Sequence, residues 1–86
     1  MADYVITFAR SARRELELLD RQIGQRVLAK IEGLRSNPRP AGAVKLAGTA
    51  NFWRIRMGDW RVIYEIDDTR RLVDVARIRH RSDAYR

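Results

Sequence analysis

The sequence predicts an α+β domain, in which an N-terminal strand and a helical hairpin pack on a mostly antiparallel β-sheet in the order β-α-α-β-β-β. Three features of the chain lead to this prediction. Apolar residues recur at helical spacing between positions 12 and 34, they alternate with polar residues from position 52 onward, and a segment containing both prolines separates the two patterns. Because the chain has 86 residues, we expect one domain spanning 1–86.

The N-terminal part predicts one strand and two helices. Residues 4–8 are rich in β-branched and aromatic side chains, which is typical of a strand. Ser11 is the expected N-cap of the first helix and Asp20 that of the second, because their side-chain oxygens can accept a hydrogen bond from the first turn. The expected core-facing stripes are Ala12, Leu16 and Leu19, followed by Ile23, Val27, Leu28, Ile31 and Leu34. Pro38 ends the second helix, and residues 37–51 are expected to form a loop.

The C-terminal part predicts three antiparallel strands at residues 52–56, 60–66 and 72–79, joined by turns at 57–59 and 67–71. A sheet that helices cover on one face buries one set of alternating side chains and exposes the other. In the second strand the expected buried set is Trp60, Val62, Tyr64 and Ile66.

Several arginines fall on the expected exposed face of these strands. They are Arg54, Arg56, Arg61, Arg77 and Arg79. Like charges held close together repel one another, and a phosphate group would relieve that repulsion. The alternative is that the arginines pair with nearby carboxylates, for which the candidates are Asp59, Glu65 and Asp74.

The chain is basic and contains no cysteine. Lys and Arg number 18 against 11 acidic residues, which gives a net charge of +7, and 16 of the basic residues are Arg. The excess is spread over both halves of the chain, so the folded body itself is basic. Such a body suggests a nucleic acid partner, and a well-solvated surface is the alternative that the charge leaves open. We find no signal peptide and no apolar run of the roughly 20 residues that span a bilayer, so we expect a cytoplasmic protein without membrane association.

Residues 79–86 combine guanidinium groups, an imidazole and a phenol, supplied by Arg79, His80, Arg81 and Tyr85. A metal-independent ribonuclease uses the 2′-OH as nucleophile, and it needs a group to remove the proton, a charge to stabilise the phosphorane and a donor for the departing 5′-oxygen. Arginine suits the second task because it is a permanent, planar cation. Tyr85 suits the first if neighbouring cations favour its ionised form, and it can also stack on a base. A structural role is the alternative for both His80 and Tyr85. No phosphate loop, metal-ligand spacing or nucleophile motif is present, so we expect neither a cofactor nor a metal.

Two segments resemble the C-terminal half of RelE-type toxins of type II toxin–antitoxin systems. They read FWRIRMGDWRVIYEI at 52–66 and RIRHRSDAYR at 77–86. The N-terminal strand, the helical hairpin and the chain length also fit, so the resemblance covers essentially the whole chain. The terminal pattern H-R-x-x-x-Y-R is the more specific part, because it separates ribosome-dependent nucleases from relatives that share only the fold.

The resemblance implies an endoribonuclease that enters the ribosomal A site and cleaves the mRNA there, which inhibits translation. By position, Arg54 and Arg56 match residues that hold the mRNA backbone, and Arg61 matches one that contacts the scissile phosphate. Arg79 matches a residue assigned to charge stabilisation or leaving-group protonation, and Tyr85 matches a tyrosine that stacks on or activates the substrate. Arg77 lies on the same expected face, and we expect it to bind RNA as well.

The chain departs from the family pattern at two places. Some relatives carry Lys at positions 54 and 56, where Lys can act as a base, whereas Arg stays protonated. The base is then Tyr85, or His80 if its ring reaches the site. Many relatives have Gly where this chain has Arg79, so Arg81 is the alternative catalytic arginine.

The resemblance also implies partners. These are a RelB-like antitoxin encoded beside the toxin, the ribosome with its mRNA, and operator DNA bound through the antitoxin. One alternative is a ParE-type toxin, which inhibits gyrase on the same fold without nuclease activity; such toxins usually lack the equivalents of Arg81 and Tyr85. Another alternative is an inactive homologue that serves only as a partner or corepressor of its antitoxin.

Overall fold

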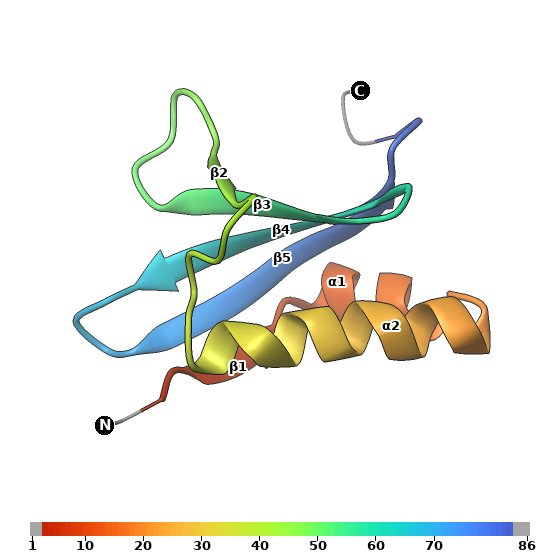
Figure 1. Cartoon of the computed structure of the whole chain (residues 1–86), viewed down its shortest axis with the longest axis horizontal. Helices are drawn as coiled ribbons and strands as arrows, with labels where there is room; N and C mark the ends of the chain where they lie inside the picture. Colours follow the sequence, from red (N-terminus) through yellow and green to blue (C-terminus); the bar gives the residue numbers. More distant parts are fainter. Residues whose placement is uncertain (1–2, 84–86) are drawn as a thin grey trace.

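The computed structural model describes residues 3–83 and has the predicted fold class. Its elements are β1 Val5–Phe8, α1 Arg10–Glu17, α2 Arg21–Glu32, the 3₁₀ helix η1 Gly33–Arg35, β2 Val44–Lys45, β3 Phe52–Met57, β4 Trp60–Asp67 and β5 Leu72–His80. The sheet order is β1-β5-β4-β3-β2, with β1 parallel to β5 and the other neighbours antiparallel. Both helices lie on one side of the sheet (Figure 1), and we call the side turned away from them the open face. Within residues 3–83, no helix is long and apolar enough to cross a membrane.

The two helices begin differently. Ala9 is the N-cap of α1 and makes no side-chain cap bond, whereas Ser11 lies inside the first turn. The Ser11 hydroxyl donates to the carbonyl of Ala76 in β5 at 3.3 Å, so this residue ties the helix to the sheet, and its prediction as a cap is wrong. The prediction for Asp20 is confirmed, because its carboxylate accepts a hydrogen bond from the Gln22 N–H at 3.2 Å.

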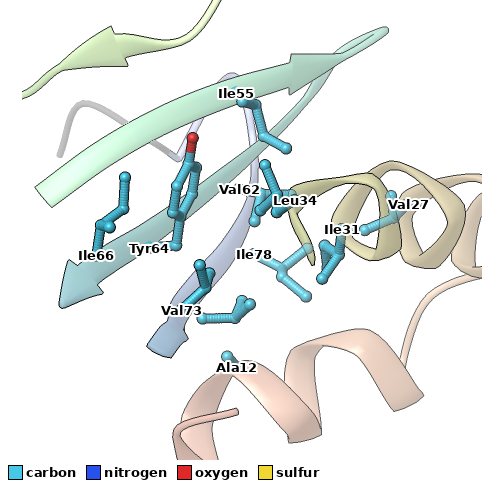
Figure 2. Packing of buried hydrophobic residues seen from close by; sticks show 11 residues of the cluster. Ala12, Val27, Ile31, Leu34, Ile55, Val62, Tyr64, Ile66, Val73 and Ile78 are labelled. Atoms are coloured by element: carbon cyan, nitrogen blue, oxygen red, sulfur yellow. The ribbon is translucent and has the colours of Figure 1, made fainter. Parts of the chain in front are cut away.

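The core lies between the helices and the sheet (Figure 2). Ala12, Val27, Ile31 and Leu34 supply its helical side, and each is at most 1% exposed. They pack against the strand residues Ile55, Val62, Tyr64, Ile66, Val73, Val75 and Ile78. Leu28 does not belong to the buried stripe, because it lies about 100° around the helix from Val27 and is 39% exposed.

The segment predicted as a loop, 37–51, contains the two-residue strand β2, which pairs with β3. Two residues are too few for an alternating pattern to be recognised in the sequence. Side chains fasten the rest of the loop to the sheet. The buried Tyr64 hydroxyl donates to the carbonyl of Pro38 at 2.7 Å, and burial raises the pKa of Tyr64 to about 12.

A second anchor joins the loop to the β4–β5 turn. Nη2 of Arg39 lies 2.8 Å from Oδ2 of Asp68, and the Tyr4 hydroxyl donates to the other carboxylate oxygen at 2.5 Å. These hydrogen bonds, that of Arg39 first, lower the pKa of Asp68 to about 2. The anchor therefore depends on an ionised Asp68.

A β-bulge at Ala76 decides which face the end of β5 presents. Val75 and Arg77 lie opposite consecutive residues of β4, so Ala76 is an extra residue between them. Val75 faces the core before the bulge and Ile78 faces it afterwards, which shifts the alternation by one position. If Ala76 were paired as part of a regular alternation, Arg77 and Arg79 would point into the core.

Candidate functional site

Three neighbouring strands place five arginines on the open face in two cross-strand rows. The rows are Arg56–Arg61–Arg79 and Arg54–Ile63–Arg77. Directly opposed residues share a face, with Cβ atoms about 5 Å apart. Alternation in the sequence predicts this face correctly for Arg54, Arg56 and Arg61, whereas Arg77 and Arg79 reach it through the β-bulge at Ala76. We call these five residues the arginine cluster.

Arg61, at the centre of the cluster, is buried more deeply than the sequence predicts. It is 7% exposed, and its Nη1 donates to the carbonyl oxygens of Gly58 and Trp60 at 3.2 and 3.3 Å. The guanidinium is thus turned toward the β3–β4 hairpin. Its Nε is buried and has no hydrogen-bond partner among the described residues. Because arginine cannot lose its proton in a protein, an anionic oxygen is the group that would complete its hydrogen bonding and offset its charge.

A carboxylate that the sequence analysis missed contacts two members of the cluster. Oε2 of Glu15, in α1, lies 3.3 Å from Nη1 of Arg79 and 3.4 Å from Nε of Arg77. The second separation is that of an ion pair without hydrogen-bond alignment. Arg79 is 64 positions away in the chain, so no local pattern in the sequence could have indicated this contact.

The open face changes charge along its strands. Beyond the two arginine rows, Glu65 lies opposite Asp74, and Asp74 accepts a hydrogen bond from Thr7 at 2.7 Å. Both carboxylates were candidate partners of the cluster, but together with Asp67 and Asp68 they line a separate shallow pocket of about 510 Å³. A polyanion is therefore attracted to the arginine end of the face and repelled from the acidic end. Within residues 3–83, no three acidic, histidine or cysteine side chains are grouped so that they could hold a metal ion.

His80 lies on the opposite face from the cluster. Strand β5 extends to this residue, one position further than predicted, and pairs it with the helix-facing Trp60. The two rings make an edge-to-face contact with centroids 5.3 Å apart. Nδ1 of His80 lies 3.0 Å from the Ser82 hydroxyl and 3.3 Å from the Ser82 N–H, so the ring contacts its own turn. The structure does not bring this imidazole to the arginines.

The last two predicted site residues lie at or beyond the end of β5. The backbone N–H of Arg81 donates to the carbonyl of Asp59 at 2.7 Å, and its mostly exposed side chain lies 3.9 Å from the Asp59 carboxylate. Asp59, the third candidate partner, thus pairs outside the cluster. Of the two candidate catalytic arginines, Arg79 shares a row with Arg61 and Arg81 does not. Tyr85 lies outside the described residues.

The geometry limits the chemistry that the cluster can perform. Several guanidinium groups on one face can hold consecutive phosphates and can stabilise additional negative charge on one of them. They cannot remove a proton, because arginine remains protonated. The cluster is therefore suited to binding a phosphate backbone and to charge stabilisation, and a base must come from another residue.

Comparisons with known proteins agree with this fold. The family described as "ParE toxin of type II toxin-antitoxin system, parDE" matches residues 6–85. Toxin RelG of Mycobacterium tuberculosis is 33% identical over 84 residues, which cover 96% of this chain and 97% of that protein.

Two solved complexes contain a similar chain. In the toxin–antitoxin complex RelBE2 of Mycobacterium tuberculosis, the match has a TM-score of 0.82 at 30% identity and covers 96% of this chain and 97% of the other. In the archaeal RelE–RelB complex of Pyrococcus horikoshii, the TM-score is 0.82 at 25% identity, over 95% and 99% of the two chains. Since the family match spans nearly the whole chain, this protein belongs to the RelE/ParE superfamily of toxins of type II toxin–antitoxin systems.

Proposed function

We propose that this toxin is an endoribonuclease that cleaves mRNA in the ribosomal A site and so inhibits translation. The observation that supports the proposal most strongly is the row Arg56–Arg61–Arg79. Its central guanidinium is buried, and its Nε has no hydrogen-bond partner within residues 3–83. A buried cation between two other cations is costly for a small domain. A phosphate that bridges these groups would offset that cost.

In this proposal, Arg54, Arg56 and Arg77 bind the phosphates that flank the cut. Arg61 and Arg79 contact the scissile phosphate. The 2′-oxygen attacks phosphorus, the bond to the 5′-oxygen breaks, and the products are a 2′,3′-cyclic phosphate and a 5′-hydroxyl. Arg61 and Arg79 stabilise the charge that develops on the phosphorane oxygens.

Proton transfer is assigned to the C-terminal residues. Tyr85 stacks on the nucleobase and, as the phenolate, accepts the proton of the 2′-OH; the departing 5′-oxygen takes its proton from water. His80 is left out, because its ring packs on Trp60 on the other face. Arg81 holds the RNA at the end of the cluster, next to the β3–β4 hairpin.

The position of the cluster supports the proposed contacts with RNA and with the antitoxin. It lies on the open side of a sheet, so the protein contacts RNA from one side, and in our proposal the ribosome holds the mRNA from the other side. An acidic or amphipathic segment of a RelB-like antitoxin, encoded in the adjacent gene, covers the cluster and neutralises it. The complex then binds operator DNA through the antitoxin, and all of these events occur in the cytoplasm.

The test is primer extension on mRNA held in preassembled ribosome complexes. We expect cleavage in phase with the codons. Arg61→Ala should lower the rate about 10²–10³-fold, the usual effect of removing one preorganised charge-stabilising donor. The matched control is Arg70→Ala, which removes an exposed arginine that lies 3.8 Å from Asp67 near the acidic end of the face; its rate should equal that of the parent. Substrate with 2′-deoxyribose at the cut site should survive, and its cleavage would refute the mechanism.

A gyrase inhibitor is the second candidate, because the matching family is described as that of ParE toxins. The two functions give opposite results in paired assays. A ribonuclease leaves DNA supercoiling by purified gyrase unchanged and cleaves ribosome-bound mRNA, whereas a gyrase inhibitor does the reverse. Inhibition of supercoiling without RNA cleavage would replace the first proposal by the second.

A further inference from the structure

Where β1 ends, helix α1 continues the contacts along the same edge of β5. β1 pairs with β5 as far as Phe8 opposite Val75. The chain then continues the edge contacts with the Ala9 N–H, which donates to the carbonyl of Val75 at 2.8 Å. Further along, Oε1 of Glu15 accepts a hydrogen bond from the backbone N–H of Ile78 at 2.8 Å. One carboxylate oxygen of α1 thus occupies a position that a strand carbonyl would otherwise fill.

The other oxygen of the same carboxylate meets the arginine cluster. Oε2 of Glu15 lies between Nη1 of Arg79 and Nε of Arg77, at 3.3 and 3.4 Å. The Glu15 side chain is 20% exposed, less than the two arginines at 36% and 42%. The hydrogen bond to the β5 backbone holds Oε1 in place, so Oε2 has a fixed position as well. Its negative charge attracts both guanidinium groups.

We propose that Glu15 is a positioning residue of the nuclease site, which holds Arg77 and Arg79 in the conformations that receive the RNA backbone. The inference rests on the proposed function. Glu15 contacts Arg77 through Nε and Arg79 through Nη1, so this carboxylate engages neither terminal nitrogen of Arg77 and only one of Arg79. The carboxylate therefore restricts the two side chains without using all of their donors.

This arrangement has opposite effects on binding and on rate. The negative charge of Glu15 lowers the positive potential of the cluster, which weakens attraction for any RNA. Fixing Arg79 against the scissile phosphate raises the rate, because a side chain that is already oriented loses less freedom in the transition state. Replacing a residue that only stabilises the fold would not change RNA affinity and cleavage rate in opposite directions.

The test compares Glu15→Gln with the parent toxin on programmed ribosomes. The amide oxygen can still accept the hydrogen bond of the Ile78 N–H, so the edge contact persists, while the charge that attracts the arginines is gone. We expect kcat to fall about tenfold or more, in line with the effect of small misplacements of catalytic groups. KM for the programmed ribosome and the Kd for single-stranded RNA should stay equal or decrease. Glu17→Gln is the matched control, because Glu17 is an exposed carboxylate of the same helix; its kcat should equal that of the parent.

A measurement on the parent protein does not depend on whether the variant folds. In NMR relaxation, the Nε–H groups of Arg77 and Arg79 should have order parameters of about 0.85, the value of a rigid backbone. The order parameter of the Arg70 Nε–H should be below about 0.6. Equal mobility of all three would overturn the assignment of Glu15.

The kinetic outcomes separate the two proposals. Equal kcat in Glu15→Gln and parent would overturn the role of Glu15 and leave the ribonuclease proposal intact. A raised KM with unchanged kcat would make Glu15 a binding residue and also overturn its positioning role. Absence of cleavage by the parent protein would overturn the proposed function, and the assignment of Glu15 with it.

Discussion

Arg61→Met replaces the buried guanidinium by an unbranched apolar side chain of similar length. In the parent, this group is 7% exposed, lies between Arg56 and Arg79, and leaves its Nε without a hydrogen bond within the described part of the chain. If Arg61 is retained for phosphate contact rather than for stability, the variant should unfold at a higher temperature while cleavage is lost.

Three contributions set the size of the change. Two unit charges about 6 Å apart repel by roughly 3 kcal/mol at an effective dielectric constant of about 20. Salt, and the pairing of Arg79 with Glu15, reduce the repulsion on Arg61 to about 1–2 kcal/mol in all. Removing the unpartnered Nε contributes about 1–3 kcal/mol. Losing the two hydrogen bonds to the hairpin carbonyls costs about 2–3 kcal/mol.

The balance favours Arg61→Met by about 1 kcal/mol in the free energy of unfolding, which for a domain of this size raises Tm by roughly 4–8 °C. Thermal melts followed by circular dichroism at two salt concentrations would measure it, and the gain should be smaller at high salt. Arg56→Met is the matched comparison: Arg56 is exposed in the same row, so its replacement relieves only the Arg56–Arg61 repulsion and should raise Tm less than Arg61→Met does. A lower Tm for Arg61→Met would refute the view that the buried charge destabilises the fold.

Three further predictions concern stability alone. Tyr64→Phe leaves the carbonyl of Pro38 without its buried donor and should cost about 1–3 kcal/mol in urea unfolding; an unchanged midpoint would contradict this. Because the pKa of Asp68 falls from its ordinary 3.8 to about 2 on folding, its contribution is fully present above pH 3.8 and is lost as the pH falls toward 2. The free energy of unfolding of Asp68→Asn should therefore fall less than that of the parent between pH 4 and 2. If the two pH profiles are parallel, the contact with Arg39 does not cause the acid-induced loss of stability. Val62→Asp puts a carboxylate at a fully buried position and should unfold the domain, at a cost of several kcal/mol; a cooperative melt close to that of the parent would reject the assignment of this face to the core.

The sequence predicts those parts of the fold that depend on a regular period. The helical stripes and the alternating strands place Val27 and Ile31 in the core and Arg61 on the open face, as the structure has them. These features are set by residues a few positions apart, where geometry follows from the backbone alone. The exclusion of His80 also follows from alternation once β5 is extended by a single residue to include it.

The parts that the sequence could not predict depend on distant contacts or on irregular backbone. Glu15 reads as one polar residue on an exposed helix face, and its contacts to Ile78 and Arg79 become visible only when α1 is placed against β5. The burial of Arg61 depends on how its side chain turns toward the hairpin, which alternation does not specify. Packing between elements, not local propensity, decides both.

The β-bulge at Ala76 can be predicted in part, because the order of apolar residues in the sequence reflects it. Buried residues of β5 are odd-numbered up to Val75, and the next one is the even-numbered Ile78. A strand can change phase in this way only by including an extra residue. Deletion of Ala76 should therefore restore regular alternation without turning any side chain over, with Arg77 and Arg79 still on the open face.

The deletion and its control make this reasoning testable. The chain lacking Ala76 should unfold cooperatively, because Ile78 stays in the core. An alanine inserted between Arg77 and Ile78 does the opposite, since it moves Ile78 to the open face and turns Arg79 inward. The insertion should cost about 2–5 kcal/mol for the lost isoleucine burial alone, a large part of the roughly 5–15 kcal/mol that stabilises a typical domain. Urea unfolding of the two variants measures the difference. If the deletion unfolds the domain while the insertion is tolerated, the register of β5, and with it the placement of two members of the arginine cluster, is wrong.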